Sequence, residues 1–259
     1  MSSPSRAATV TPALSTQGLE KSFGSLVVAR DISISLPQGA RYALIGPNGA
    51  GKTTLINLMT GMLRPDAGRI YLGGENITAQ RPHQRVSRGL VRTFQINTLF
   101  PNLNALEAVA LAVCEHRRVS GNFWNGLATF SDVTDEAQSI LDSLSLGTDG
   151  TKPTRELAYG QQRLLEIALA LACKPKVLLL DEPAAGVPRD ESAELLTAIA
   201  GLPSDITVLF IEHDMNLVFR FATRIIVMVG GGILLEGTPQ EISSDPRVRE
   251  VYLGGAHHG

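Results

Sequence analysis

The chain has 259 residues, a formal net charge of −2 and a sequence pI near 6.2, and its length suits one domain or one core with an inserted subdomain. This balanced charge gives no electrostatic case for nucleic acid, because nucleic-acid-binding domains carry a basic patch and a high pI. No apolar stretch reaches the roughly 20 residues that a membrane span requires, and the N-terminus lacks the apolar segment of a secretory signal. If the protein works at a membrane, other chains must supply the spans.

The N-terminal part of the chain predicts short strands in front of a glycine-rich loop. Residues 1–13 predict a flexible tail. Three short β-type runs follow, separated by turn residues: 26–28, 32–36 and 42–45. After the glycine-rich loop, an apolar helical pattern covers 55–62. Residues 69–77 then predict a strand with a turn at Gly73-Gly74.

Four arginines in the next segment recur at near-helical spacing: Arg81, Arg85, Arg88 and Arg92. A solvated helix surface is the favoured interpretation of this pattern. A basic face is the alternative.

The remaining sequence predicts an inserted helical region followed by alternating strands and helices. The pattern from 104 to about 146 is helical, and we expect a helical subdomain over about 98–157. The later elements are a strand at 177–180, a helix at 191–200, a strand at 207–211, a glycine-centred hairpin in IIVMVGGGILLEG and a tail at 256–259. All-apolar runs such as VLLL are typical of strands buried on both faces of a parallel sheet. The fold class is therefore α/β, with an antiparallel strand region in front.

The strongest chemical signal is the stretch GPNGAGKTT, which matches the phosphate-loop pattern GxxxxGK[ST] between a predicted strand and a predicted helix. Its glycines let backbone N–H groups surround phosphate oxygens, and the helix adds its positive N-terminal end. We expect Lys52 to reach the β- and γ-phosphates and Thr53 to ligate Mg²⁺. The predicted nucleotide contacts are Gly46, Pro47, Asn48, Gly49, Ala50, Gly51, Lys52, Thr53 and Thr54.

A second signal is VLLLDEP, a buried apolar strand that ends in two carboxylates. Ligands bind at this end of the strands in open α/β sheets. We expect Asp181 to lie near Mg²⁺, directly or through water, and Glu182 to polarise the attacking water as a general base.

With these motifs in order, the chain resembles the nucleotide-binding subunits of ATP-binding cassette transporters over roughly residues 14–255. The resemblance implies a P-loop NTPase (RecA-like) core with an antiparallel β subdomain and an inserted α-helical subdomain. It also implies three further site residues. Phe23, in KSFG, is similar to the aromatic that stacks on adenine; Gln95, in VRTFQ, to the glutamine that senses Mg²⁺ and γ-phosphate; and His213, in FIEHD, to the histidine that contacts γ-phosphate.

The stretch LAYGQQ occupies the place of the family's signature loop, where Tyr159, Gly160 and Gln161 are the expected contacts to nucleotide on a second subunit. Ala158 stands where the usual serine bonds γ-phosphate, and losing such a bond costs about 1.5–3 kcal/mol if nothing replaces it. Tyr159 replaces a glycine, and the loop AAGVPRDE lacks the common Ala-Leu-Asp. Five stretches together resemble the branched-chain (hydrophobic) amino acid uptake importers, in which the signature departure is a subfamily mark: FGSLVVARDIS, VRTFQ, LAYGQQRLLEIALAL, DEPAAGVP and VREVYLGG.

The resemblance implies an ATPase that powers an importer at the cytoplasmic face of the inner membrane. Its cofactors would be ATP and Mg²⁺. Its partners would be transmembrane permease subunits, a second ATPase subunit that is identical or paralogous, and indirectly a substrate-binding protein. Alternatives are a urea or amide importer, a lipopolysaccharide exporter, a soluble cassette protein without a membrane partner, and a small-molecule P-loop kinase. Nothing in the residues separates one cargo from another.

Overall fold

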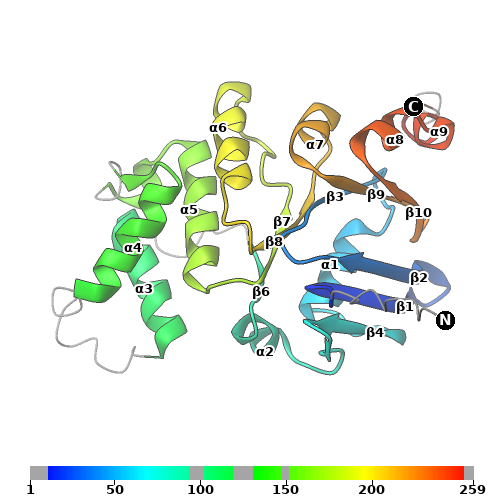
Figure 1. Cartoon of the computed structure of the whole chain (residues 1–259), viewed down its shortest axis with the longest axis horizontal. Helices are drawn as coiled ribbons and strands as arrows, with labels where there is room; N and C mark the ends of the chain where they lie inside the picture. Colours follow the sequence, from blue (N-terminus) through cyan, green and yellow to red (C-terminus); the bar gives the residue numbers. More distant parts are fainter. Residues whose placement is uncertain (1–10, 94–101, 119–130, 148–151, 254–259) are drawn as a thin grey trace, which may run out of the picture.

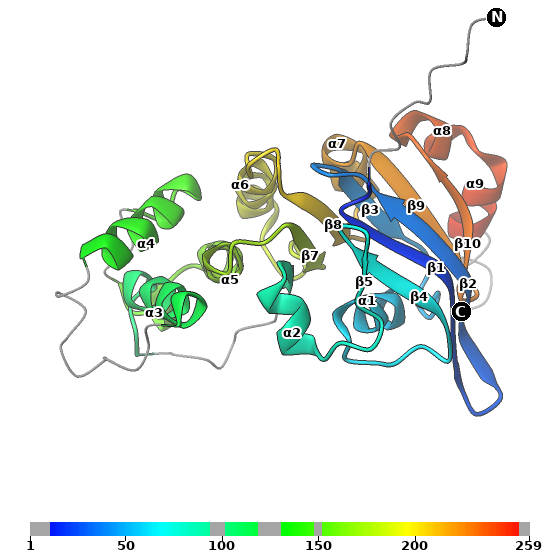
Figure 2. The same ribbon diagram turned by 60° about the horizontal axis from the view of Figure 1, so that its bottom comes forward.

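The computed structural model describes residues 11–93, 102–118, 131–147 and 152–253, apart from the side chains of residues 189 and 190. Its core holds two sheets, with a group of helices at the end of the molecule away from the antiparallel sheet (Figures 1 and 2). Within the described residues, no helix is long and apolar enough to cross a membrane. The fold class expected from the sequence, a P-loop α/β core, is confirmed.

The larger sheet has six strands in the order β10-β9-β3-β8-β7-β6. Its strands are β3 (Arg41–Ile45), β6 (Leu90–Arg92), β7 (Val177–Asp181), β8 (Thr207–Ile211), β9 (Arg224–Val229) and β10 (Gly232–Gly237). The five strands β6, β7, β8, β3 and β9 pair in parallel in that order. At the edge, β10 pairs antiparallel with β9 and forms the expected hairpin. The carboxyl ends of β3 and β7 therefore open at the same edge, with β8 between them.

The two faces of this sheet bury alternate side chains in two separate cores. Leu178 and Leu180 of β7 pack toward the helices on one face, whereas Val177 and Leu179 pack toward the helix α1 and the second sheet. This alternation explains why VLLL is apolar throughout, because successive side chains of a strand point to opposite faces.

The smaller, antiparallel sheet has the order β2-β1-β4-β5. Its strands are β1 (Leu14–Phe23), β2 (Leu26–Leu36), β4 (Ala67–Leu72) and β5 (Glu75–Asn76). The expectation of two separate runs within 26–36 is wrong, because Asp31 takes a left-handed φ of 48° and a bulged register lets β2 continue. The sequence did not predict β1, because Gly18 and the same register shifts interrupt its alternation of apolar and polar residues.

The helices surround the two sheets and form the group at one end. They are α1 (Lys52–Thr60), α2 (Pro82–Ser87), α3 (Ala105–Arg117), α4 (Ser131–Ser143), α5 (Tyr159–Ala172), α6 (Arg189–Ala200), α7 (Met215–Phe221), α8 (Pro239–Ser244) and α9 (Pro246–Leu253), with the 3₁₀ turn η4 (Thr154–Glu156) before α5. Helix α5 packs against α3 and α4, and its first residue belongs to the LAYGQQ stretch. The short elements β6, α2 and α7–α9 lack the length that would make a periodic pattern visible in the sequence.

The expectation that the arginine series forms a solvated helix surface is wrong for Arg92, which lies in strand β6, and for Arg85, which is buried. The Arg85 side chain is 1% exposed, and its guanidinium donates to four backbone carbonyls, those of Leu58, Met59, Thr78 and Gln80. Burial lowers the pKa of Arg85 to about 10, which leaves it charged at neutral pH. Arg88 is exposed and pairs with Glu75, as a surface residue should.

Candidate active site

The phosphate-loop motif connects the end of β3 to the start of α1, as its sequence predicts. Two of its glycines have no room for a side chain. A Cβ at Gly46 (φ 154°) would lie 2.2 Å from the Met228 carbonyl oxygen, and one at Gly51 (φ 101°) would lie 2.6 Å from the Val28 carbonyl oxygen. The loop is therefore held between β9 and β2, in a backbone conformation that glycine alone adopts without strain.

Lys52, the first residue of α1, is buried under this loop. Its Nζ donates to the carbonyl oxygens of Gly46, at 2.7 Å, and Pro47, at 3.1 Å. Burial lowers the pKa of Lys52, while the nearby carboxylates of Glu182 and Asp181 act to raise it. The ammonium group is thus placed inside the curve of the loop, where an anion would meet it.

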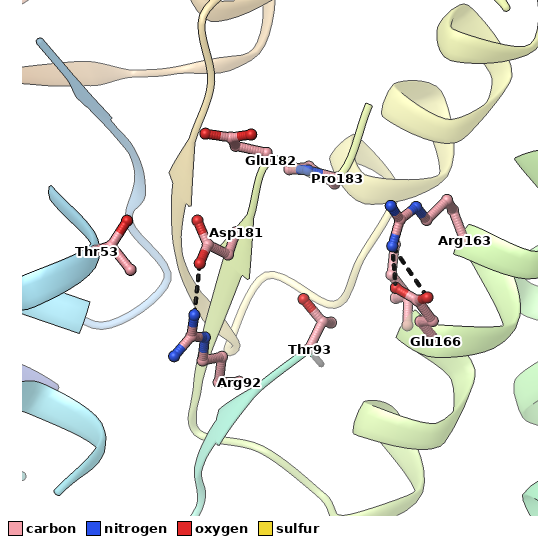
Figure 3. Close-up of a pocket in the computed structure, with 9 residues that line it drawn as sticks. Thr53, Arg92, Thr93, Arg163, Glu166, Asp181, Glu182 and Pro183 are labelled. Atoms are coloured by element: carbon pink, nitrogen blue, oxygen red, sulfur yellow. Dashed lines mark hydrogen bonds and ion pairs between the residues drawn. The ribbon is translucent and has the colours of Figure 1, made fainter. Parts of the chain in front are cut away.

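A pocket of about 310 Å³ opens at the carboxyl end of β7. Thr53 lines one side, and Asp181 and Glu182 line another (Figure 3). The other lining residues are Arg92, Thr93, Arg163, Glu166, Ile167 and Pro183. The pocket brings together three of the residues that the sequence predicts to act on metal and water.

Glu182, which lines this pocket, also contacts His213. The Nε2 atom of His213 is 2.7 Å from Oε1 of Glu182. Glu182 takes a left-handed φ of 49°, which costs a non-glycine residue roughly 1 kcal/mol. This conformation turns Glu182 out of the strand direction, so its carboxylate meets the histidine that follows β8.

Glu212, which sequence reasoning did not single out, organises the loops on both sides of this pair. The side chain is 5% exposed and accepts hydrogen bonds from the backbone N–H groups of Ala184, at 2.9 Å, and His213, at 3.2 Å. Burial raises the pKa of Glu212, and the charge of Glu182 raises it further. Its place beside His213 in FIEHD is the only signal that the sequence offered.

The signature stretch begins α5, and its amide groups are used within the chain. The side chain of Gln161 turns back to accept from the N–H of Ala158 at 3.1 Å. The N–H of Gly160 donates to Oε2 of Glu191 at 2.7 Å. Glu191, near the start of α6, was not predicted, and it places a carboxylate at the N-terminal end of α5, where the helix favours negative charge.

Tyr159, whose presence the sequence did not explain, joins α5 to the loop that precedes α6. Its hydroxyl accepts from Arg163 at 2.9 Å, and the guanidinium stacks over the ring at 5.1 Å. A Cβ at Gly186 would lie 3.4 Å from the ring. Arg163 also donates to both oxygens of Glu166 at 3.0 Å, which makes a buried ion pair at the edge of the pocket.

The last two predicted residues differ in what the structure says of them. Phe23 ends β1 with its ring 51% exposed, and Lys21 stacks on it at 5.6 Å. A flat aromatic surface is therefore available there for a ring-shaped ligand. Gln95 lies outside the described residues.

The fit of Mg²⁺ to this site depends on Thr53 and Asp181. A hydroxyl and a carboxylate are the hard oxygen ligands that Mg²⁺ prefers when phosphates complete its coordination. Among the residues that the structure describes, no group of three or more histidine, cysteine, aspartate or glutamate side chains is placed to hold a metal ion. The hydroxyl of Thr53 and the carboxylate of Asp181 fit a cation whose other ligands are phosphate oxygens and water.

The fold and these residues define a P-loop nucleotide-binding protein, and comparison with known proteins narrows the class. Residues 29–185 match the ABC transporter family, and residues 233–258 match the family described as branched-chain amino acid ATP-binding cassette transporter. The chain belongs to the ATP-binding cassette (ABC) transporter family. Its members are ATPases whose hydrolysis is coupled to transport, and they bind nucleotide.

Two curated relatives resemble the chain along almost its whole length. It is 39% identical to the high-affinity branched-chain amino acid transport ATP-binding protein BraF of Pseudomonas aeruginosa, covering 95% of this chain and 99% of that protein. The corresponding protein LivG of Escherichia coli is 38% identical, with the same coverage.

Solved structures agree with the fold. The ADP conformation of an ATP-binding cassette of an ABC transporter superposes with a TM-score of 0.81 at 33% identity, over 93% of this chain and 98% of that one. A nucleotide-free cassette superposes equally well, at 32% identity.

The C-terminal match brings one more residue to the phosphate loop. Tyr252, on α9, is half-buried and forms a hydrogen bond with the Gly46 backbone. Burial raises the pKa of Tyr252 to about 12, although this hydrogen bond acts to lower it. The segment that matches the branched-chain family, residues 233–258, thus contacts the first glycine of the loop.

Proposed function

We propose that this chain is the ATP-binding and ATP-hydrolysing subunit of an importer for branched-chain or other hydrophobic amino acids. Both named relatives belong to such systems, and the chain covers 99% of each. The observation that carries the chemistry is the meeting of Thr53, Asp181 and Glu182 around one pocket, with His213 bonded to Glu182.

Nucleotide would bind along the phosphate loop, with adenine on Phe23 and the phosphates against the loop amides and Lys52. Thr53, Asp181 and Gln95 would hold Mg²⁺, which would neutralise charge on the β- and γ-phosphates. Glu182 would accept a proton from water as the water oxygen bonds to the γ-phosphorus. The bond from that phosphorus to the β–γ bridging oxygen then breaks, ADP leaves with the electron pair, and His213 orients Glu182 and the γ-phosphate.

Each site would be completed by Tyr159, Gly160 and Gln161 of a second ATPase subunit, identical or paralogous. The N–H of Gly160 would then point at the γ-phosphate. Because Glu191 of the same chain accepts from this N–H, closure requires that hydrogen bond to open. The subunit therefore carries a carboxylate where the phosphate of the second site must arrive.

We further propose that residues 14–255 form one cassette with its helical subdomain over about 98–157, between tails at 1–13 and 256–259. The cassette would sit at the cytoplasmic face of the inner membrane, attached through permease subunits, and a separate substrate-binding protein would select the cargo. No nucleic acid partner is proposed, since the charge gives no basis for one.

The test is uptake by the complete system. The gene would be expressed with its neighbouring permease and binding-protein genes, and accumulation of radiolabelled leucine, isoleucine and valine would be followed in cells lacking their own importers. We expect uptake that disappears in the Lys52→Ala variant. Uptake of urea or amides instead, or lipopolysaccharide export, would reassign the cargo.

A second experiment separates transport from other roles of cassette ATPases. We expect the chain to co-purify with its permeases from membranes. Co-purification with ribosomes would contradict the transport assignment and favour a soluble cassette protein. Phosphoryl transfer to a metabolite would favour a kinase.

A further inference from the structure

Arg92 lies where two of the proposed Mg²⁺ ligands are brought together. It is the last residue of β6, the edge strand, and its backbone pairs opposite Leu179 of β7. Its side chain is 15% exposed and extends into the 310 Å³ pocket.

The guanidinium connects two separate elements of the site. Nη2 donates to Oδ2 of Asp181 at 2.5 Å, and Nη1 donates to Oδ1 of Asn57 at 2.7 Å. Asp181 ends β7, whereas Asn57 lies in α1, the helix that the phosphate loop begins. The rigid, planar fork of an arginine suits such a two-sided contact, which a lysine ammonium cannot reproduce.

The helical spacing of Asn57 extends this contact to Thr53. The two residues are four positions apart in α1, so their side chains share one face of the helix. Holding Asn57 therefore sets the orientation of the face that presents the Thr53 hydroxyl. Through the sheet, α1 is connected to β7 only by way of β3 and β8, whereas the Arg92 side chain joins α1 to β7 directly.

The contact with Arg92 uses one oxygen of the Asp181 carboxylate and leaves the other available. Only one of its oxygens is bonded to Arg92, and the other points away from the guanidinium (Figure 3). A carboxylate fixed in this way can offer its second oxygen to a cation or to a cation-bound water.

We propose that Arg92 is a positioning residue for the divalent cation, which fixes Asp181 relative to Thr53 by bridging Asp181 and Asn57. This inference depends on the proposed Mg²⁺ site. Arg92 itself does not touch the cation. It presets the distance between the two protein ligands before Mg·ATP arrives, and so increases the share of nucleotide affinity that depends on Mg²⁺.

The test measures the affinity of the full chain for a fluorescent ATP analogue with Mg²⁺ and with EDTA, in wild type, Arg92→Met and Arg92→Lys. The gain is the ratio of the affinity with Mg²⁺ to the affinity in EDTA. We expect Arg92→Met to lower this gain about tenfold, while its affinity in EDTA stays within twofold of wild type. Arg92→Lys should recover only part of the gain, because it keeps the charge and loses the fork. Full recovery by lysine would overturn the bridging argument and leave a purely electrostatic role.

Two further variants complete the design. Asn57→Ala removes one arm of the bridge, so it should lower the gain less than Arg92→Met, and the double variant should be no worse than Arg92→Met alone. Arg88→Met, which removes an exposed ion pair with Glu75 outside the pocket, is the matched control and should behave as wild type.

The outcomes distinguish this inference from the function it rests on. If wild type shows no gain from Mg²⁺, the proposed Mg²⁺ site fails. If wild type shows the gain and Arg92→Met retains it, only the role of Arg92 fails. A fall in affinity that is equal with Mg²⁺ and with EDTA, together with a lower melting temperature, would show that Arg92 merely supports the fold.

Discussion

The two regions that we propose to meet nucleotide, the phosphate loop with the end of β7 and the start of α5, are built differently. In the first, the backbone places the chemistry: neighbouring carbonyls leave room only for glycine at Gly46 and Gly51. In the second, side chains place it. Glu191 of α6 accepts from the N–H of Gly160, and Arg163 holds the Tyr159 ring, which lies beside Gly186 in the loop before α6.

This difference explains where the sequence departs from its family. The phosphate loop matches its pattern at every defined position, because a changed glycine would collide with backbone. The start of α5 has Ala158 and Tyr159 at positions where the common signature has serine and glycine. A helix end offers N–H groups whatever side chains it carries, so substitution there is tolerated as long as Gly160 is kept.

The largest effect that the comparison predicts is in the first region. Glu182→Gln should lower ATP hydrolysis at least about a hundredfold, because general-base catalysis contributes on the order of 10²–10⁴-fold. Binding of ATP should persist, and ATP-dependent dimers should become easier to trap by size-exclusion chromatography. Phosphate release measured under saturating ATP provides the rate. Unchanged hydrolysis would remove Glu182 from the role of base.

Gly160→Asp is the corresponding change in the second region, the start of α5. A Cβ at this position would lie 2.6 Å from Oε2 of Glu191, and the new carboxylate would face the proposed γ-phosphate. We expect hydrolysis to be abolished while binding of ATP to the isolated subunit remains within about threefold, about 0.7 kcal/mol. Normal hydrolysis by this variant would show that α5 meets no nucleotide.

Glu191→Gln should make the proposed closure of two subunits around ATP easier. Glutamine keeps an acceptor for Gly160 and loses the charge, which is worth about 0.3–1 kcal/mol at a helix N-terminus. In a Glu182→Gln background, the ATP concentration that gives half-maximal dimerisation should fall about two- to fivefold. Glu194→Gln, an exposed change on the same helix, is the control. A rise in the required ATP concentration would contradict the view that Glu191 opposes closure.

Ala158→Ser should have the smallest effect. It restores the hydroxyl of the common signature, yet the N–H groups of α5 are present without it. Steady-state ATPase activity should stay the same or rise modestly, within about threefold. The N–H groups already replace most of the missing bond, so the added hydroxyl should contribute about 0.5 kcal/mol, the low end for a net hydrogen bond. A large loss would mean that Tyr159 and Ala158 are adapted to one another.

The sequence was sufficient for residues that belong to contiguous motifs. Thr53, Asp181 and Glu182 lie at loop and strand ends that the apolar runs predict, and they line one pocket. Lys52 is close enough for the charges of Glu182 and Asp181 to act on it. Most strands of the larger sheet and the longer helices were predictable for the same reason, whereas β1 and β6 were not.

The supporting residues could not be predicted, because their roles arise from contacts between distant parts of the chain. Arg92 and Asp181 are 89 positions apart, and Glu191 lies 31 positions from Gly160. No local period or spacing signals such pairs. Arg85 shows the same limit in reverse, since its helical spacing suggested a solvated side chain, whereas tertiary packing buries it.

The buried Arg85 has a mechanical consequence for the working cycle. Its guanidinium binds the last carbonyls of α1 and the carbonyls of Thr78 and Gln80, so the helix that starts at the phosphate loop is fastened at its far end to the segment leaving the antiparallel sheet. The phosphate loop, α1 and both sheets are thereby joined by direct contacts. The helices α3 and α4 contact the rest of the described structure chiefly through α5, so a change in the orientation of α5 would carry them with it.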